Sequence, residues 1–138
     1  MTDVFTKKKR SEVMSRIKSK DTKPEITLRK ALHQQGYRFR LHVTSLPGKP
    51  DIILPMYRTV IQVRGCFWHG HDCTDGHIPK SRQAYWKPKL LNNMRRDARN
   101  DAALRRADWL VIVVWECGVQ NPKLLDKEVR RILRLLRR

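Results

Sequence analysis

A loop rich in cysteine and histidine constrains the fold of this chain more than any other feature. From Gly65 to Pro79 the hydrophobic periodicity of the flanking sequence disappears, and Cys, His and Gly accumulate. Within this loop the spacing is Cys66-x4-His71-x-Cys73, and Cys117 follows an apolar run later in the chain. The loop has too few apolar residues to fold by itself, so we expect a cross-link to hold it.

Zinc is the cross-link that this set of residues favours. An odd number of cysteines argues against a disulfide framework. Three thiolates with one imidazole make a closed tetrahedral set, which is typical of a structural zinc site. His69 and His77 are spare candidates for the imidazole, and three buried, unreactive cysteines are the alternative. The predicted zinc ligands are Cys66, His71, Cys73 and Cys117.

The apolar pattern predicts a helix, three strands, a helix, a strand and a helix. Thr22 and Glu25 have the form of a capping box at the first helix, which Gly36 ends. Three predicted strands follow, over Tyr37–Val43, Asp51–Leu54 and Thr59–Val63, and a hairpin at Pro55–Arg58 joins the last two. A helix over Tyr85–Arg106 comes next, and then a strand over Leu110–Trp115 that we expect to be buried on both faces. The final helix has one apolar stripe, formed by Leu125, Val129, Ile132, Leu133 and Leu136. This order predicts an α/β fold, with a mixed α+β sheet flanked by helices. The chain length of 138 residues suits a single domain.

The charge points to a polyanionic partner. Lys and Arg number 31 against 13 Asp and Glu, which gives a net charge of +18. Nucleic acid is the first candidate, because each phosphate that a cation neutralises releases counterions. A membrane surface is the competitor, but the charge spreads from Lys7 to Arg138 rather than along one amphipathic helix. A basic surface without a specific partner is the plainest alternative. Because Met1 to Arg10 has no apolar core and no membrane span is present, we expect a soluble protein of the cell interior.

A second group of residues suits a hard metal ion. Pro50-Asp51 opens one predicted strand and Gln62-Val63-Arg64 lies on the next, a layout that resembles the PD-(D/E)xK nuclease pattern. In this chain Gln62 and Arg64 replace its second acid and its lysine. Hard cations take oxygen ligands, which makes Asp51 the best single candidate.

Two further acids and a histidine could share this chemistry. Glu25 and Asp97 lie on predicted helices that could cover the sheet. The alternatives are a capping role for Glu25 and an ion pair with a nearby arginine for Asp97. His69 could exchange a proton with water near neutral pH, although a lone histidine is more often structural.

Several apolar side chains lie on basic, polar segments. Phe67 and Trp68 are adjacent in the polar loop, and Trp86 begins the next helix. Such rings can stack on bases or wedge between them, and packing around the loop is the alternative. Met14 and Ile17 lie in a charged segment and suit insertion into a minor groove, unless they belong to a helix packed on the core. The predicted DNA-contacting residues are Met14, Ile17, Phe67, Trp68, Trp86 and Lys89.

One resemblance covers nearly the whole chain, from about Arg10 to Arg134. The run Gly65–Cys73, with Leu46–Asp51 before it and Val114–Cys117 after it, strongly resembles the very-short-patch mismatch repair endonucleases. Further matches are Met14, Asp21–Glu25, Asn93 and Arg96-Asp97.

The resemblance implies a fold like that of type II restriction endonucleases, as one endonuclease domain over residues 1–138. A DNA-contacting segment at 1–20 and a zinc and aromatic loop at 65–80 would belong to it. The implied reaction is magnesium-dependent nicking of duplex DNA 5′ to the thymine of a T:G mismatch that arises from deamination of 5-methylcytosine. Because a T:G pair stacks poorly, opening it costs less than opening a correct pair.

The resemblance also implies roles for single residues. Asp51 would bind magnesium with the Val63 carbonyl, and His69 would be the general base. Glu25 and Asp97 would hold metal-bound waters or orient that histidine. The aromatic rings would enter from the major groove, next to the mismatch, and Met14 and Ile17 from the minor groove.

One position departs from the family pattern. Members commonly have His where this chain has Arg64. An arginine cannot shuttle protons but can clamp phosphate with two donors, so we expect retained but altered activity.

Three alternatives stay open at this point. They are a zinc-stapled DNA-binding module that has lost cleavage, a nickase with broader mismatch tolerance, and an RNA-binding protein. We expect a monomer in the bacterial cytoplasm, associated with the nucleoid and with no membrane partner. An accessory mismatch-repair protein is a further candidate partner.

Overall fold

The computed structural model describes residues 22–69, 71, 73 and 83–137. Its element order confirms the predicted succession of helices and strands. The elements are α2 (Lys23–Gln34), β1 (Arg40–Leu41), β2 (Ile52–Leu54), the short 3₁₀ helix η1 (Pro55–Tyr57), β3 (Thr59–Arg64), α3 (Gln83–Arg106), β4 (Leu110–Trp115), the 3₁₀ helix η4 (Glu116–Val119) and α4 (Pro122–Leu136).

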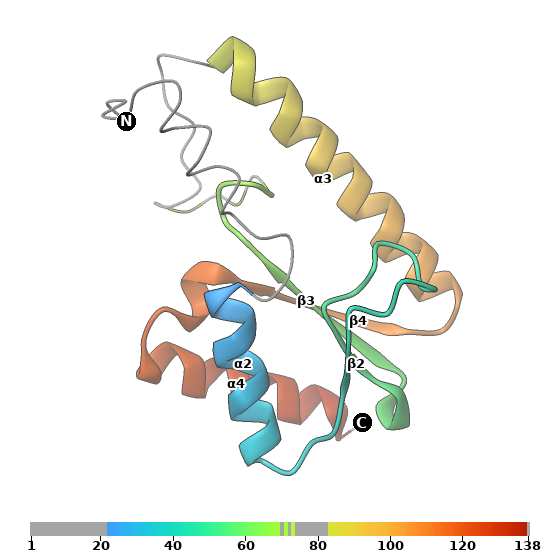
Figure 1. Ribbon diagram of the computed structural model, residues 1–138, viewed down its shortest axis with the longest axis vertical. Helices are drawn as coiled ribbons and strands as arrows, with labels where there is room; N and C mark the ends of the chain where they lie inside the picture. Colours follow the sequence, from blue (N-terminus) through green and yellow to red (C-terminus); the bar gives the residue numbers. More distant parts are fainter. Residues whose placement is uncertain (1–21, 70, 72, 74–82, 138) are drawn as a thin grey trace.

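The four strands form one mixed sheet in the order β1-β2-β3-β4. β1, β2 and β3 pair antiparallel, and β4 pairs parallel to β3 from Thr59↔Leu110 to Arg64↔Trp115. A parallel neighbour requires a crossover connection, and α3 supplies it. Figure 1 shows α3 apart from α2 and α4, which lie together across the sheet.

Alternating residues of the strands face two separate apolar clusters. Ile52 and Leu54 pack with α2 and α4, together with Ile61 of β3. Ile53 and Val60 point to the other face and pack against Leu104 of α3, among others. Because side chains alternate along a strand, the two clusters lie on opposite faces, as the predicted sheet flanked by helices requires. The mixed α/β architecture is therefore confirmed.

β1 is much shorter than the predicted strand over Tyr37–Val43. Regular pairing ends at His42, whose φ of 50° places it in the left-handed region. Residues that have a Cβ rarely adopt this backbone conformation, and it interrupts the alternation of side chains along the strand. Tyr37 and Phe39 still pack against the larger core cluster, as their spacing predicted.

The predicted capping box at the start of α2 is wrong. Thr22 does occupy the N-cap position, but its side chain makes no capping hydrogen bond. Glu25 is only 1% exposed and reaches Arg29 and His42 instead. Glu25 therefore pairs with His42, which lies outside its own helix, instead of taking the capping role that the motif suggested.

β4 has the predicted bounds but only part of the predicted burial. Ile112 and Val114 are buried, whereas Leu110 is exposed. β4 lies at one edge of the described sheet, so it has a strand neighbour on one side only. Ile112 and Val114 are buried in the larger cluster, whereas Val111 is only partly buried against the cluster that contains Leu104, so the predicted burial on both faces is confirmed for one face and only in part for the other.

None of the helices in the described part of the chain is both long and apolar enough to cross a lipid bilayer.

The packing of α2 on the sheet gives a prediction for stability. Leu28 is fully buried in the larger core cluster, so Leu28→Ala should lower the free energy of unfolding by about 2–5 kcal/mol. Met56 is 88% exposed, so Met56→Ala should change it by less than about 0.5 kcal/mol. Urea unfolding of both variants checks this, and equal losses would contradict the packing described here.

Candidate functional site

The four predicted zinc ligands lie together. The thiol sulfurs of Cys66, Cys73 and Cys117 and a ring nitrogen of His71 all lie within 4.8 Å of one another. The backbone N–H of Cys117 donates to the Cys66 sulfur at 3.4 Å, and the Cys117 sulfur lies 3.6 Å from His71 Nδ1. Of the spare histidines, His69 contacts another residue, described below, and His77 lies outside the described residues.

The chemistry of this cluster fits a zinc ion. Burial raises the pKa of the Cys66 thiol to about 12, and burial also raises the pKa of Cys117. A bound cation would stabilise the thiolates that burial disfavours. The His71 ring stacks on Trp115 at 4.1 Å between centroids, which fixes the orientation of the imidazole. Three sulfurs and one nitrogen are a zinc donor set.

A second cluster joins α2, the end of β1 and the start of β2. Carboxylate oxygens of Glu25 and Asp51 and a ring nitrogen of His42 lie within 4.8 Å of one another. The backbone N–H of Val63 donates to Asp51 Oδ2 at 2.8 Å. Sequence analysis predicted the two acids and missed His42, whose only signal was its polar place in an alternating segment.

Asp51 has a strongly shifted pKa. Burial raises it from 3.8 to about 7, against the lowering effect of the Val63 hydrogen bond, and the neighbouring charge of Glu25 raises it further. Two carboxyl groups held together away from water favour a shared proton or a bound cation. Oxygen donors of this kind suit a hard divalent metal ion.

The loop after β3 presents His69 to α3. Nδ1 of His69 lies 2.5 Å from Asp97 Oδ2, which brings together two residues that the sequence predicted separately. Asn93 of α3 donates to the Trp68 carbonyl at 2.8 Å and so ties the same loop to the helix. An ionised carboxylate accepts hydrogen bonds only, so Nδ1 is the donor in this contact and Nε2 is the ring nitrogen that does not face Asp97.

Arg64 also faces α3, where it meets a residue that sequence analysis missed. Its Nη2 donates to both carboxylate oxygens of Asp101, at 2.7 and 2.8 Å, and its Nε lies 3.8 Å from Asp97 Oδ2. The Arg64 and Asp101 side chains are 11% and 9% exposed. A phosphate contact by Arg64 would therefore compete with an ion pair that is already made.

The three predicted wedge residues form a half-buried aromatic group. The rings of Phe67, Trp68 and Trp86 meet edge to face, with centroids 5.1 to 5.7 Å apart. Tyr85, which the sequence analysis did not single out, extends the group to Lys89. The Lys89 ammonium donates to the Tyr85 hydroxyl and lies 4.3 Å from the centre of its ring. Met14 and Ile17 lie outside the described residues.

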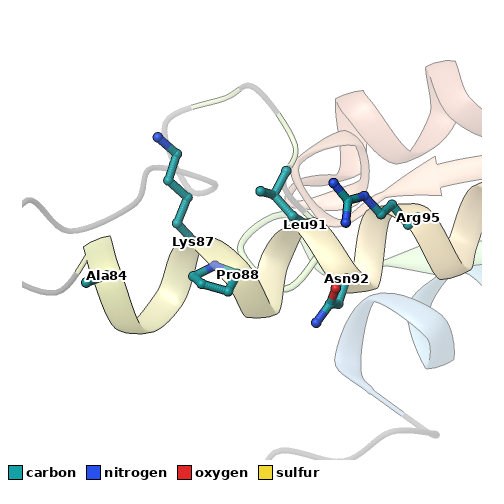
Figure 2. Close-up of a pocket in the computed structure, with 6 residues that line it drawn as sticks. All are labelled: Ala84, Lys87, Pro88, Leu91, Asn92 and Arg95. Atoms are coloured by element: carbon teal, nitrogen blue, oxygen red, sulfur yellow. The ribbon is translucent and has the colours of Figure 1, made fainter.

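A surface pocket on α3 is separate from these clusters. Figure 2 shows Lys87, Leu91 and Arg95 along one side of the helix, four residues apart, with Pro88 and Asn92 beside them. Among the described residues, α3 alone supplies the lining, and none of the predicted site residues placed there takes part in it. The pocket is therefore a depression on a basic helix surface rather than a reaction centre.

Comparison with known proteins gives consistent matches. The family model described as DNA mismatch endonuclease Vsr matches residues 2–75. The chain is 47% identical to the type II nicking enzyme V.NmeAIP of Neisseria meningitidis serogroup A, over 97% of this chain and 96% of the relative. It is 48% identical to the type II nicking enzyme V.XorIIP of Xanthomonas oryzae pv. oryzae, over 96% of this chain and 98% of the relative. It is 40% identical to the DNA mismatch endonuclease Vsr of Escherichia coli K12, over 93% of this chain and 82% of the relative.

The ion pair between Arg64 and Asp101 gives a prediction for stability. Arg64→Ala or Asp101→Ala leaves a poorly solvated charge without its partner, so each should lower the free energy of unfolding by about 3–5 kcal/mol. The double variant should lose less than the sum of the two. Asp126 and Arg130 form an exposed pair on α4, so the same cycle there should give a coupling below about 0.5 kcal/mol. Additive losses at Arg64 and Asp101, measured by urea unfolding, would contradict the pair.

The shifted pKa of Asp51 gives a prediction for pH dependence. With a pKa of about 7 in the folded protein and 3.8 as its ordinary value, Asp51 binds more protons folded than unfolded between these limits. Its contribution to stability is therefore full at low pH and is lost as the pH rises through about 7. The measurement is the free energy of unfolding of Asp51→Asn minus that of the unmodified protein, in buffer with zinc and without magnesium. This difference should increase from pH 5 to pH 8, because the neutral amide has no proton to lose. A difference that is constant across this range would contradict the shift.

Proposed function

Because the chain belongs to the Vsr family of DNA mismatch endonucleases and is a DNA-cleaving hydrolase, we propose that it nicks duplex DNA 5′ to the thymine of a T:G mismatch. The observation that carries this proposal is that adjacent residues of β3 hold both halves of a reaction centre. Val63 binds Asp51, and Arg64 faces Asp97, the partner of His69. Neighbouring residues of β3 thus contact the acidic cluster on one side and the partner of His69 on the other.

His69 is the proposed general base. Asp97 accepts the proton of Nδ1 and holds the imidazole in the tautomer whose Nε2 can take a proton from the attacking water. Asp97 is a positioning residue in this scheme, and Arg64, which is itself paired with Asp101, lies beside it. Asn93 fixes the backbone just before His69.

Magnesium is the proposed catalytic cofactor, held by Asp51 and Glu25 with the Val63 carbonyl. The N–H and C=O of one residue in an extended strand point to the same edge, so that carbonyl faces the side on which Asp51 accepts the Val63 N–H. The ion would stabilise the negative charge that builds up on the scissile phosphate. The two carboxyl groups orient toward one shared position without it.

A structural zinc ion is the second proposed cofactor. Cys66 and His71 lie on the loop that carries His69, and Cys117 follows β4. Zinc at these ligands would fasten the loop to the end of the sheet. It would thereby hold His69 at the distance from Asp97 that base catalysis needs.

Mismatch recognition is assigned to the aromatic group. Phe67, Trp68 and Trp86 would wedge into the duplex from the major groove beside the T:G pair, which stacks poorly and opens at low cost. Met14 and Ile17 would enter from the minor groove. Lys89 and the net charge of +18 supply phosphate contacts.

The remaining parts of the proposal concern context. We propose that residues 1–138 act as one domain and as a monomer, since cutting one strand needs one reaction centre. The substrate, T:G from deaminated 5-methylcytosine, would place the protein at the nucleoid in the bacterial cytoplasm. An accessory mismatch-repair protein is a further proposed partner.

A strand-resolved nicking assay tests the proposal. Duplexes with T:G or T:A in one sequence context are incubated with the zinc-loaded protein, either with MgCl₂ or without it. We expect a nick in the thymine strand of T:G only, and only with magnesium. Asp51→Asn or His69→Ala should lower the rate at least about 100-fold while DNA binding is kept. Asp126→Asn, an exposed acid on α4, is the matched control.

Each other outcome of this assay selects a different function. Tight binding of T:G without a nick would indicate a binding module that has lost cleavage, and Arg64→His would then be tested for restored activity. Equal cutting of T:G in several flanking sequences would indicate broader mismatch tolerance. Stronger competition by single-stranded RNA than by mismatched DNA would contradict the substrate class.

A further inference from the structure

We propose that His42 is a third side-chain ligand of the catalytic metal, and that it makes this site bind Mn²⁺ in preference to Mg²⁺. The inference rests on the proposed function, because it concerns the same metal site. The expected ligands from the family resemblance were Asp51 and the Val63 carbonyl, and His42 was not among them. The structure adds His42 to Glu25 and Asp51 as one compact group.

The spacing within the group suits a six-coordinate ion. Nε2 of His42 lies 3.3 Å from Glu25 Oε2. Two neighbouring ligands of an octahedral ion, each about 2.1 Å from it, lie about 3.0 Å apart. All three ligand atoms lie within 4.8 Å of one another, and opposite octahedral positions are about 4.2 Å apart. Small movements would therefore bring the three atoms around one ion.

The backbone holds His42 at this place. The register of β1 and β2 pairs Leu41 with Ile52, so the next residues on each strand are His42 and Asp51. The His42 N–H donates to the Asp51 carbonyl at 3.3 Å, and its φ of 50° turns the chain there. A left-handed residue other than glycine costs free energy, and such strain persists where the surrounding structure imposes it.

The side chain is also placed to meet an ion that enters from solvent. The His42 side chain is 22% exposed, whereas that of Glu25 is 1% exposed. The same Glu25 oxygen, Oε2, also lies 3.6 Å from Nη1 of Arg29. The partly exposed His42 and Asp51 side chains can therefore be reached from solvent, whereas Glu25 is buried beside them.

The nature of the donor decides the metal preference. Mg²⁺ prefers six oxygen ligands and binds nitrogen weakly, whereas imidazole is a good ligand for transition metals. A site with two carboxylates alone would distinguish Mg²⁺ from Mn²⁺ only weakly. An added imidazole nitrogen should raise the affinity for Mn²⁺ and leave that for Mg²⁺ nearly unchanged.

Metal binding by the full chain tests this without reference to activity. The protein is first given one equivalent of Zn²⁺, and is then titrated with MnCl₂ or MgCl₂ by calorimetry. We expect His42→Gln to weaken Mn²⁺ binding about tenfold or more and Mg²⁺ binding less than about twofold. His33→Gln, at an exposed position near the end of α2, should change neither. Thermal unfolding shows whether each variant folds.

Imidazole NMR of the unmodified protein gives a reading that needs no variant. Substoichiometric Mn²⁺ should broaden the His42 ring signals before those of His33. Early broadening of His42 together with selective loss of Mn²⁺ affinity in His42→Gln supports the inference. If Asp51→Asn abolishes Mn²⁺ binding and His42→Gln leaves it within about twofold, His42 pairs only with Glu25 and the inference is wrong. If the unmodified protein binds neither ion, the proposed catalytic metal fails as well.

Discussion

The pairing of β3 with its two neighbours, antiparallel to β2 and parallel to β4, is the constraint on which both clusters depend. Parallel strands end at the same edge of a sheet, and the register pairs Arg64 with Trp115. Cys66 and Cys117 therefore follow two residues beyond one paired position, and the Cys117 N–H reaches the Cys66 sulfur. Residues from distant parts of the sequence become neighbours through backbone pairing. The loop after β3 contributes the other two ligands of the cluster, His71 and Cys73.

The same end of the sheet organises the proposed reaction centre. A parallel pair needs a crossover, and α3 is that crossover, so Asp97 and Asp101 necessarily pass over one face of β3. Arg64 meets both acids there, while the preceding residue of β3 binds Asp51 on the side of β2. The Cys/His cluster, the pair of His69 with Asp97 and the cluster of Glu25, His42 and Asp51 all form around β3 and its two neighbouring strands.

The spacing of residue types along the chain predicted the helices and strands and the chemistry of single motifs. It did not predict the contacts that depend on which residues lie opposite one another on neighbouring strands. Apolar spacing was enough for α4, and the grouping of Cys66, His71 and Cys73 in one loop predicted their meeting with Cys117. His42 and Asp101 were missed because their importance comes from residues opposite them on β2 and β3. The capping box failed for the same reason, since Glu25 is drawn to a partner beyond its own helix.

The central claim is that a Cys₃His zinc ion joins the ends of β3 and β4 and so holds the loop that carries His69. The most direct measurement is zinc K-edge X-ray absorption on the purified full chain. The account predicts one zinc ion with three sulfur ligands at about 2.3 Å and one nitrogen at about 2.0–2.1 Å. Exchange of Cys117 for alanine should remove one sulfur from that shell. A zinc-free protein, or zinc held by oxygen and nitrogen alone, would contradict it.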